Sequence, residues 1–245
     1  MPYQHNPSPS DLQLRRATGA DLDNLTKIAQ AGFPDDPEWN YRFPYRYKHP
    51  EDNWKWTRKE YEEYLDQPGK YSVLLATLPA EQCTDRNDSS DGDAHRTNRI
   101  SIALAVWDVS VTKMSKDRDG GINERKDANP QHIKEFTDAL DAASEKYFSG
   151  HGERQLHLWL LTTHPDFRRL GAGSMLTRWG MDVAGEKGWP VTVLASPMGD
   201  KLYQALGFKV IGNVTVQVDG EEEKLVVSCL QWIKRCLTTR SCDIM

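Results

Sequence analysis

Apolar residues along the chain follow two spacings, one typical of strands and one typical of helices. Alternating or continuous apolar runs predict strands at residues 12–15, 71–78, 99–109, 156–163, 191–194, 208–218 and 225–232. Apolar residues three and four apart predict helices at residues 18–33, 57–65, 130–147, 170–186 and 200–206. Because strands and helices do not alternate regularly, this order predicts an α+β (mixed α/β) domain.

Short polar motifs mark where several of these elements begin. Thr18 stands three residues before Asp21, which is the spacing of a helix capping box. The pair Asn129-Pro130 combines a capping side chain with proline at the first helical position. Asp219-Gly220 lies between the last two strands and predicts a hairpin turn there.

Polar segments divide the chain into a single domain and its flanks. We expect a flexible tail at residues 1–11, one domain at 12–235 and a C-terminal tail at 236–245. The acidic insert at 80–98 contains almost no large apolar residue and is predicted to be a disordered loop that joins two strands. A second charged loop is predicted at 110–128. Removal of the acidic insert should leave activity intact.

Composition limits the function classes that need to be considered. The 245 residues carry a net charge of −5 with a pI of about 5.8, so the chain has no overall basic footprint and nucleic acid is not an expected partner. No run of about 20 apolar residues occurs, and the N-terminus has no apolar signal core. These features predict a cytoplasmic protein without a membrane span.

The cysteines predict neither a disulfide framework nor a metal site. Cys83, Cys229, Cys236 and Cys242 form no paired spacing that suits zinc, which favours a reducing compartment and no bound metal. The last four residues, from Cys242 to Met245, fit a farnesylation pattern. Asp243 is a poor aliphatic residue, however, so an unmodified tail is favoured over lipidation.

A basic, glycine-spaced turn follows the strand at 156–163. Gly171 and Gly173 leave room for a ligand, and Arg168 and Arg169 add positive charge just before a helix whose first N–H groups have no partner inside the helix. Such a turn can hold a phosphate or a diphosphate. The alternative is a tight turn with solvated arginines. The spacing is neither that of a P-loop nor that of a dinucleotide fingerprint, because Leu176 stands where the third glycine would be.

The run Arg168-x-x-Gly171-x-Gly173 resembles the acetyl-CoA diphosphate motif of the GNAT acetyltransferase superfamily. Two downstream features resemble the same family: Ser196 after a short strand, and Tyr203 four residues before a Gly-Phe pair. The resemblance is specific over residues 156–212 and looks like a group common in fungi. It implies a central, mostly antiparallel twisted sheet with flanking helices and splayed central strands.

The resemblance also implies a role for particular residues. Backbone groups of Leu161, Thr162 and Thr163 would pair with the pantetheine arm of acetyl-CoA. The diphosphate would lie against the segment made by Arg168, Arg169, Leu170, Gly171, Ala172, Gly173 and Ser174. Ser196 replaces an asparagine that often contacts the cofactor. Tyr203 would lie near the sulfur and protonate the departing thiolate, since a phenol can donate to a thiolate as charge develops.

Neither the general base nor the acceptor site is fixed by the sequence. Six side chains remain open as bases: His157, His164, Asp108, Asp35, Asp36 and Glu38. Residues 35–56 combine aromatic side chains with carboxylates. That segment either binds an amine by cation–π and charge contacts or forms a small core against the sheet, and both can hold at once.

Three functions remain after this reasoning. The first is an acetyl-CoA-dependent N-acetyltransferase whose acceptor is a small-molecule or peptide amine. The second is a non-catalytic acyl-CoA-binding regulatory module of the same fold. The third is an unrelated phosphate-binding protein. The oligomeric state is left open by the sequence.

Overall fold

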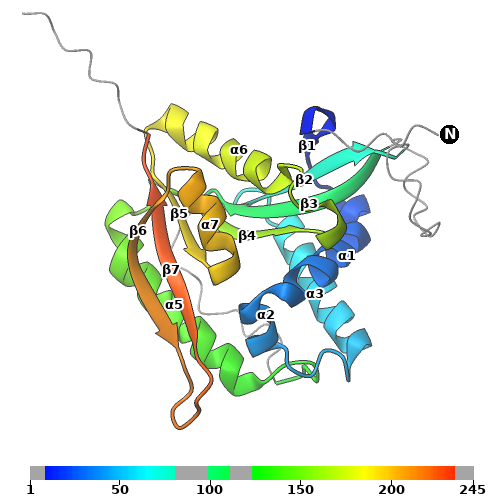
Figure 1. Cartoon of the computed structure of the whole chain (residues 1–245), viewed down its shortest axis with the longest axis vertical. Helices are drawn as coiled ribbons and strands as arrows, with labels where there is room; N and C mark the ends of the chain where they lie inside the picture. The colour runs from blue at the N-terminus through cyan, green and yellow to red at the C-terminus, as the bar shows by residue number, and fades with distance from the viewer. Residues whose placement is uncertain (1–8, 81–98, 111–122, 235–245) are drawn as a thin grey trace, which may run out of the picture.

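The computed structural model describes residues 9–80, 99–110 and 123–234 (Figure 1). Within these ranges the elements form one layered α+β arrangement. Several predictions lie outside the described residues. These are the N-terminal and C-terminal tails, the acidic insert, most of the second charged loop, and Cys83, Cys236 and Cys242.

A seven-stranded sheet forms the centre of the molecule, in the order β1-β2-β3-β4-β5-β7-β6. Every neighbouring pair is antiparallel except β4 and β5, which run parallel. The strands are β1 (Gln13–Arg16), β2 (Tyr71–Pro79), β3 (Arg99–Asp108), β4 (Leu156–Thr163), β5 (Val191–Ala195), β6 (Lys209–Val216) and β7 (Leu225–Trp232).

Helices cover both faces of this sheet. On one face α1 and α3 pack together against β2 and β3, and α6 covers the opposite face (Figure 1). The α5 helix lies against β6 and β7, and α7 lies beside β5. The helices are α1 (Leu22–Gly32), α2 (Pro37–Arg42), α3 (Pro50–Leu65), α5 (Pro130–Phe148), α6 (Ala172–Lys187) and α7 (Pro197–Ala205).

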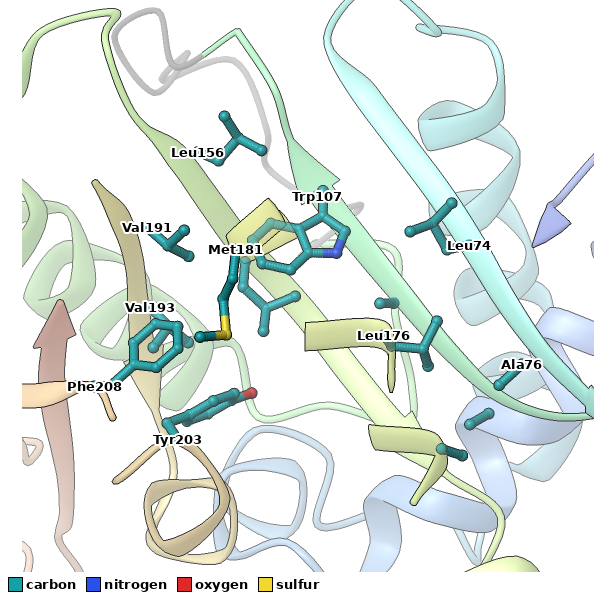
Figure 2. Packing of buried hydrophobic residues seen from close by; sticks show 14 of the residues in the cluster. Leu74, Ala76, Trp107, Leu156, Leu176, Met181, Val191, Val193, Tyr203 and Phe208 are labelled. Atoms are coloured by element: carbon teal, nitrogen blue, oxygen red, sulfur yellow. The ribbon is translucent and has the colours of Figure 1, made fainter. Parts of the chain in front are cut away.

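The β2 strand has a nearly continuous apolar run because helices cover it on both faces. Leu74 and Ala76 join the cluster under α6, while Val73 and Leu75 join the cluster under α1 and α3. Successive side chains of a strand point to opposite faces, so a strand covered on both faces is apolar at most positions. Figure 2 shows the first of these clusters, with Trp107 at its centre.

The central strands separate soon after they pair. The register of β4 with β5 joins Leu156–Leu158 to Val191–Val193. Past Leu158, β4 continues for five residues beside β3 without a partner from β5 in this register. This splay, the mostly antiparallel sheet and the flanking helices confirm the fold class that the sequence predicted.

Two helices begin earlier than the sequence predicted, and a third was not predicted. The α3 helix begins at Pro50 instead of residue 57, because proline at the first position and the acidic Glu51 and Asp52 favour a start there. The α2 helix, which was not predicted, begins after Asp36 caps it. The α7 helix begins at Pro197, three residues earlier than expected. The capping box of Thr18 and Asp21 and the Asn129 cap are confirmed.

Candidate active site

A cavity of about 770 Å³ lies where β4 and β5 separate. Its walls come from the end of α1, from α2, from the splayed half of β4, from the first turn of α6 and from β5 and α7. This volume is within the range of sites that hold small ligands and cofactors. Of the predicted cofactor-binding residues, the cavity is lined by Leu161, Thr162, Thr163, Arg168, Arg169, Gly171, Ala172, Gly173, Ser174, Ser196 and Tyr203.

The first turn of α6 forms one end of the cavity. Gly171 caps this helix with φ 93°, in the left-handed region that suits glycine, and Arg169 also has a positive φ of 70°. A side-chain carbon at Gly173 would lie 3.3 Å from the Leu202 side chain. The two glycines therefore permit the turn and the close approach of α7. The first turn of α6, whose N–H groups have no partner within the helix, lines the cavity.

Arg168 and Arg169 have different surroundings. The Arg168 guanidinium donates to Asp35 Oδ2 at 2.6 Å and to the Gly32 carbonyl at 2.9 Å. It therefore ties the glycine turn to the end of α1, a positioning contact that the sequence did not indicate. Arg169 is exposed at the cavity rim. Lys201 also lines the cavity. Sequence reasoning missed it, although it is a basic residue near the start of a helix that follows a motif.

Leu170 differs from the other predicted cofactor-binding residues. Its side chain is half-buried and packs against the core cluster under α6. It is not among the residues that line the cavity. An apolar side chain inside this tight turn gains more by contact with the core than by facing an anionic ligand. The structure thus places Leu170 as an anchor of the turn.

The end of α1 makes a close contact with β4. A side-chain carbon at Gly32 would lie 2.9 Å from the Thr163 carbonyl oxygen, so only glycine fits without displacing backbone. Thr162 and Thr163 therefore lie directly under the end of α1 while they line the cavity. This contact packs the end of α1 against the half of β4 that pairs with β3 but has no β5 partner.

Tyr203 is part of the core and of the cavity wall. It is 5% exposed, its ring lies 5.6 Å from the ring of Phe208, and Figure 2 shows its hydroxyl pointing away from Phe208. Burial, followed by the charges of Glu38 and Asp36, raises the pKa of Tyr203 well above its usual value near 10. The phenol therefore keeps its proton at neutral pH. Tyr203 therefore packs in the core and also lines the cavity.

Ser196 links two helix starts. As the cap of α7 it accepts a hydrogen bond from the Gly199 amide at 3.3 Å, and its hydroxyl donates to Asp36 Oδ2 at 2.5 Å. Asp36 in turn caps α2 by accepting from the Glu38 amide at 2.9 Å. Residues 160 positions apart are thus joined, and this link fixes α2 beside α7.

Glu38 is an acidic side chain of the cavity wall whose surroundings disfavour its charged form. It is half-buried in the cavity wall, and its Oε1 is enclosed without a hydrogen-bond partner among the described residues. Burial, with a smaller contribution from the charge of Asp36, raises its pKa to about 8, and Arg42 partly opposes this rise. A carboxyl group with this pKa can accept a proton near neutral pH.

The other candidate bases have structural partners or lie away from the cavity. His157 is buried beside Thr192, bonded through Nδ1 at 2.9 Å, and burial lowers its pKa to about 4. Asp108 accepts from the Ser110 amide, and Asp35 pairs with Arg168. His164 accepts from the Asp166 amide in the turn after β4. Of the six candidate bases, Glu38 and Asp36 line the cavity and the other four do not.

The aromatic segment at 35–56 forms small buried clusters and also contributes to the cavity wall. Tyr41 and Phe43 are buried in small clusters against α5 and the neighbouring loop. Phe33 and Trp39 stack with ring centroids 5.1 Å apart, and both also line the cavity. The α2 helix therefore presents an aromatic wall next to the Glu38 and Asp36 carboxylates.

The described residues contain neither a candidate metal cluster nor a helix suited to span a membrane. Residues 9–80, 99–110 and 123–234 hold no cluster of three or more histidine, cysteine or acidic side chains that could bind a metal ion. In the same ranges no helix is both long enough and apolar enough to cross a membrane. Cys229, the cysteine within them, is buried and unpaired, and burial raises its pKa to about 11.

Comparison with known proteins gives relatives at low sequence identity. No protein-family model matches the chain. A curated protein named acetyltransferase, from Stachybotrys chartarum, is 22% identical over 231 residues, which is 91% of each chain.

Solved acetyltransferases share the architecture described above. An agmatine N-acetyltransferase structure has a TM-score of 0.60 at 14% identity, over 91% of this chain and 100% of that one. A mosquito arylalkylamine N-acetyltransferase-like protein has a TM-score of 0.57 at 16% identity, over 91% of this chain and 100% of that one. A GNAT superfamily phosphinothricin acetyltransferase from Sinorhizobium meliloti, in complex with acetyl-CoA, has a TM-score of 0.50 at 14% identity. The match covers 91% of this chain and 88% of that one. These similarities confirm the fold that the sequence motifs predicted.

Proposed function

We propose that this chain, which has the fold of the GNAT superfamily, is an acetyl-CoA-dependent N-acetyltransferase that transfers the acetyl group to an amine by direct attack. The proposal rests chiefly on one observation. The cavity at the β4–β5 splay brings a buried phenol, Tyr203, and the carboxyl group of Glu38 beside a glycine-spaced helix start. The Oε1 atom of Glu38 has no hydrogen-bond partner among the described residues. A similarity in fold alone would not supply these groups.

The residues at the α6 end of the cavity suit the diphosphate of acetyl-CoA. The N–H groups that begin α6 and the partial positive charge of that helix favour an anion, and the Gly171 and Gly173 positions leave it room. Arg169 and Lys201 would add full charges, while Arg168 would hold the turn in place through Asp35. The edge of Leu161–Thr163 that has no β5 partner would accept the pantetheine arm by backbone hydrogen bonds.

The chemistry follows from the two groups at the other end. A protonated amine must lose a proton before it can attack, and Glu38 would accept that proton directly or through water. The amine nitrogen then forms a bond to the thioester carbonyl carbon, the carbon–sulfur bond breaks, and the second proton that the nitrogen loses ends on the released thiol of CoA. The Tyr203 hydroxyl would stabilise the departing thiolate by a hydrogen bond. Its raised pKa makes this role more favourable than complete proton transfer.

The first experiment separates binding from turnover. Calorimetry should detect acetyl-CoA binding to the full chain, and a panel of amines with free-thiol detection should reveal product. The Glu38→Gln variant keeps the shape of the side chain but cannot accept the proton. We therefore expect it to bind acetyl-CoA normally and to lose about 100-fold or more in turnover.

The pH dependence of the same reaction gives a second readout. In the native enzyme kcat/KM should rise with pH through about 8, because the active form of Glu38 is the deprotonated one. This rise should be absent from the residual activity of Glu38→Gln. Binding of acetyl-CoA without product from any amine would instead support the regulatory module, and absence of binding would reject both.

Three broader predictions accompany this proposal. We propose that residues 12–235 act as one domain, since Leu12 and Leu230, near the two ends of that range, belong to the same core cluster. The cytoplasmic location and the absence of a metal requirement remain predictions from the sequence.

A further inference from the structure

Arg42 lies at the acceptor end of the cavity. It stands one helical turn after Glu38 on α2, its side chain is half-buried, and both residues line the cavity. Residues four apart on a helix have side chains on the same face, with Cβ atoms about 6 Å apart. The guanidinium of Arg42 and the carboxyl group of Glu38 are therefore neighbours in the wall that faces Tyr203.

The Arg42 side chain is held in place by aromatic rings. Its guanidinium carbon lies 4.5 Å from the ring centre of Phe136 and 5.0 Å from that of Phe43. Its Nε donates to the Glu38 carbonyl at 3.4 Å. Within the described residues it makes no ion pair with a carboxylate, so its terminal N–H groups are available to a ligand. The rings fix the orientation of the planar group before any ligand binds.

The nearby carboxylates are already committed to other partners. Asp36 accepts from the Ser196 hydroxyl and the Glu38 amide, and Asp35 pairs with Arg168. The raised pKa of Glu38 keeps a large share of that group neutral near pH 7. A half-buried guanidinium that makes no ion pair among the described residues is costly, and an incoming anionic group would relieve that cost.

We propose that the acceptor is an amino-carboxylate, a small molecule with a carboxylate close to the reacting amine, and that Arg42 binds this carboxylate. A guanidinium can donate two parallel hydrogen bonds to a carboxylate, which fixes its orientation as well as its position. The amine would then lie beside Glu38, one helical turn away. Phe33 and Trp39 line the same end and suit an apolar side chain. This inference rests on the proposed acetyl transfer.

Pairs of acceptors that differ only in the carboxylate test the inference on the full chain. The pairs are L-phenylalanine with 2-phenylethylamine, and L-leucine with 3-methylbutylamine. With acetyl-CoA and free-thiol detection, kcat/KM should be about 10- to 100-fold higher for each acid, the range expected for hydrogen bonds to a charged group. Product identity is checked by mass spectrometry.

The Arg42→Gln variant should remove that preference. It should lower kcat/KM for the two acids by about 10- to 100-fold, mainly through KM, and change kcat/KM for the two amines little. Arg58→Gln is the matched control, because Arg58 pairs with Asp23 at the surface and is not among the cavity residues. It should change neither class. Arg42→Lys keeps the charge but loses the double hydrogen bond. Its kcat/KM for the two acids should therefore lie between the values of the wild type and of Arg42→Gln.

Each outcome decides the inference. If the wild-type protein acetylates the amines as well as the acids, or if Arg42→Gln lowers both classes equally, Arg42 has only a structural role. The inference then fails while acetyl transfer stands. If acetyl-CoA binds and no acceptor of either class gives product, the inference fails and the proposed function loses its support. Because the wild-type comparison needs no variant, poor folding of Arg42→Gln would not rescue the inference.

Discussion

At the scale of single residues, Glu38 shows how position in the fold changes an ordinary side chain. Glu38 loses hydration in the cavity wall and lies next to the charge of Asp36, so its charged form is disfavoured. Burial and the charge of Asp36 thus bring the pKa of Glu38 into the range of a general base. The same two causes lower the free energy of unfolding when Glu38 is charged.

That cost predicts a specific dependence of stability on pH. Between the unfolded value of 4.5 and the folded value of about 8, the folded protein holds a proton on Glu38 that the unfolded chain has released. The Glu38 contribution to the free energy of unfolding therefore falls as pH rises through this window. Glu38→Gln lacks the titration, so its stability relative to wild type should improve from pH 5 to pH 8 in urea denaturation. A constant difference across that window would contradict the raised pKa.

Tyr203 allows a second prediction at this scale. Tyr203→Phe removes only the hydroxyl, so the ring should keep its packing on Phe208 and the fold should be unchanged. We expect kcat to fall about 100-fold, because stabilisation of the leaving thiolate is lost, while the calorimetric affinity for acetyl-CoA stays the same. Thermal melting of both proteins provides the control. An unchanged kcat would show that Tyr203 is only a core residue.

At the scale of elements, the position of α6 depends on a glycine in its middle. A side-chain carbon at Gly180 would lie 2.2 Å from the fully buried indole of Trp107. Glycine costs helix stability, so its presence here is explained by the contact with the sheet and not by the helix itself. This close approach sets how α6, with its first turn at the cavity, lies over β3 and β4.

A pair of matched substitutions in α6 tests this explanation. Gly180→Ala should destabilise the protein by about 1–3 kcal/mol, because the added methyl group overpacks a core that cannot yield. Gly185→Ala is the same change five residues later, where the nearest atom is Cδ of the flexible Lys234 side chain at 3.0 Å. It should stabilise by up to about 1 kcal/mol through helix propensity. Urea denaturation measures both, and equal effects would refute the packing argument.

At the scale of the whole molecule, the cavity joins elements from distant parts of the chain. A ligand that contacts α2, β4, α6 and α7 together binds only the folded state. Such a ligand raises the free energy of unfolding by about 2.7 kcal/mol at a concentration of 100 times Kd, or about 5–10 °C in melting temperature for a chain of this size.

Thermal melting with different ligands then tests the proposed co-substrate. CoA and acetyl-CoA should raise the melting temperature by about that amount, whereas ATP and NAD should not. A variant with Arg169→Gln and Lys201→Gln should show a smaller shift, because two charges that face the diphosphate are removed. A shift with ATP or NAD but none with CoA would favour the unrelated phosphate-binding protein.

The sequence by itself determined the strands, most of the helices and the glycine-spaced turn before α6. These features depend on near neighbours in the chain: the period of apolar residues, the caps Thr18 and Asn129, and the glycines of the turn. It also limited the candidate bases to six side chains. It could not choose among them, because each is an ordinary histidine or carboxylic acid until its surroundings are known.

Only the tertiary structure decided which of these residues meet. Arg168 pairs with Asp35 across 133 positions, and Ser196 bonds to Asp36 across 160. The burial that raises the pKa of Glu38, and the absence of an ion pair at Arg42 among the described residues, follow from how α2 lies against the splayed strands. Burial and long-range pairing depend on packing between elements distant in the chain, and local sequence patterns carry no record of that packing.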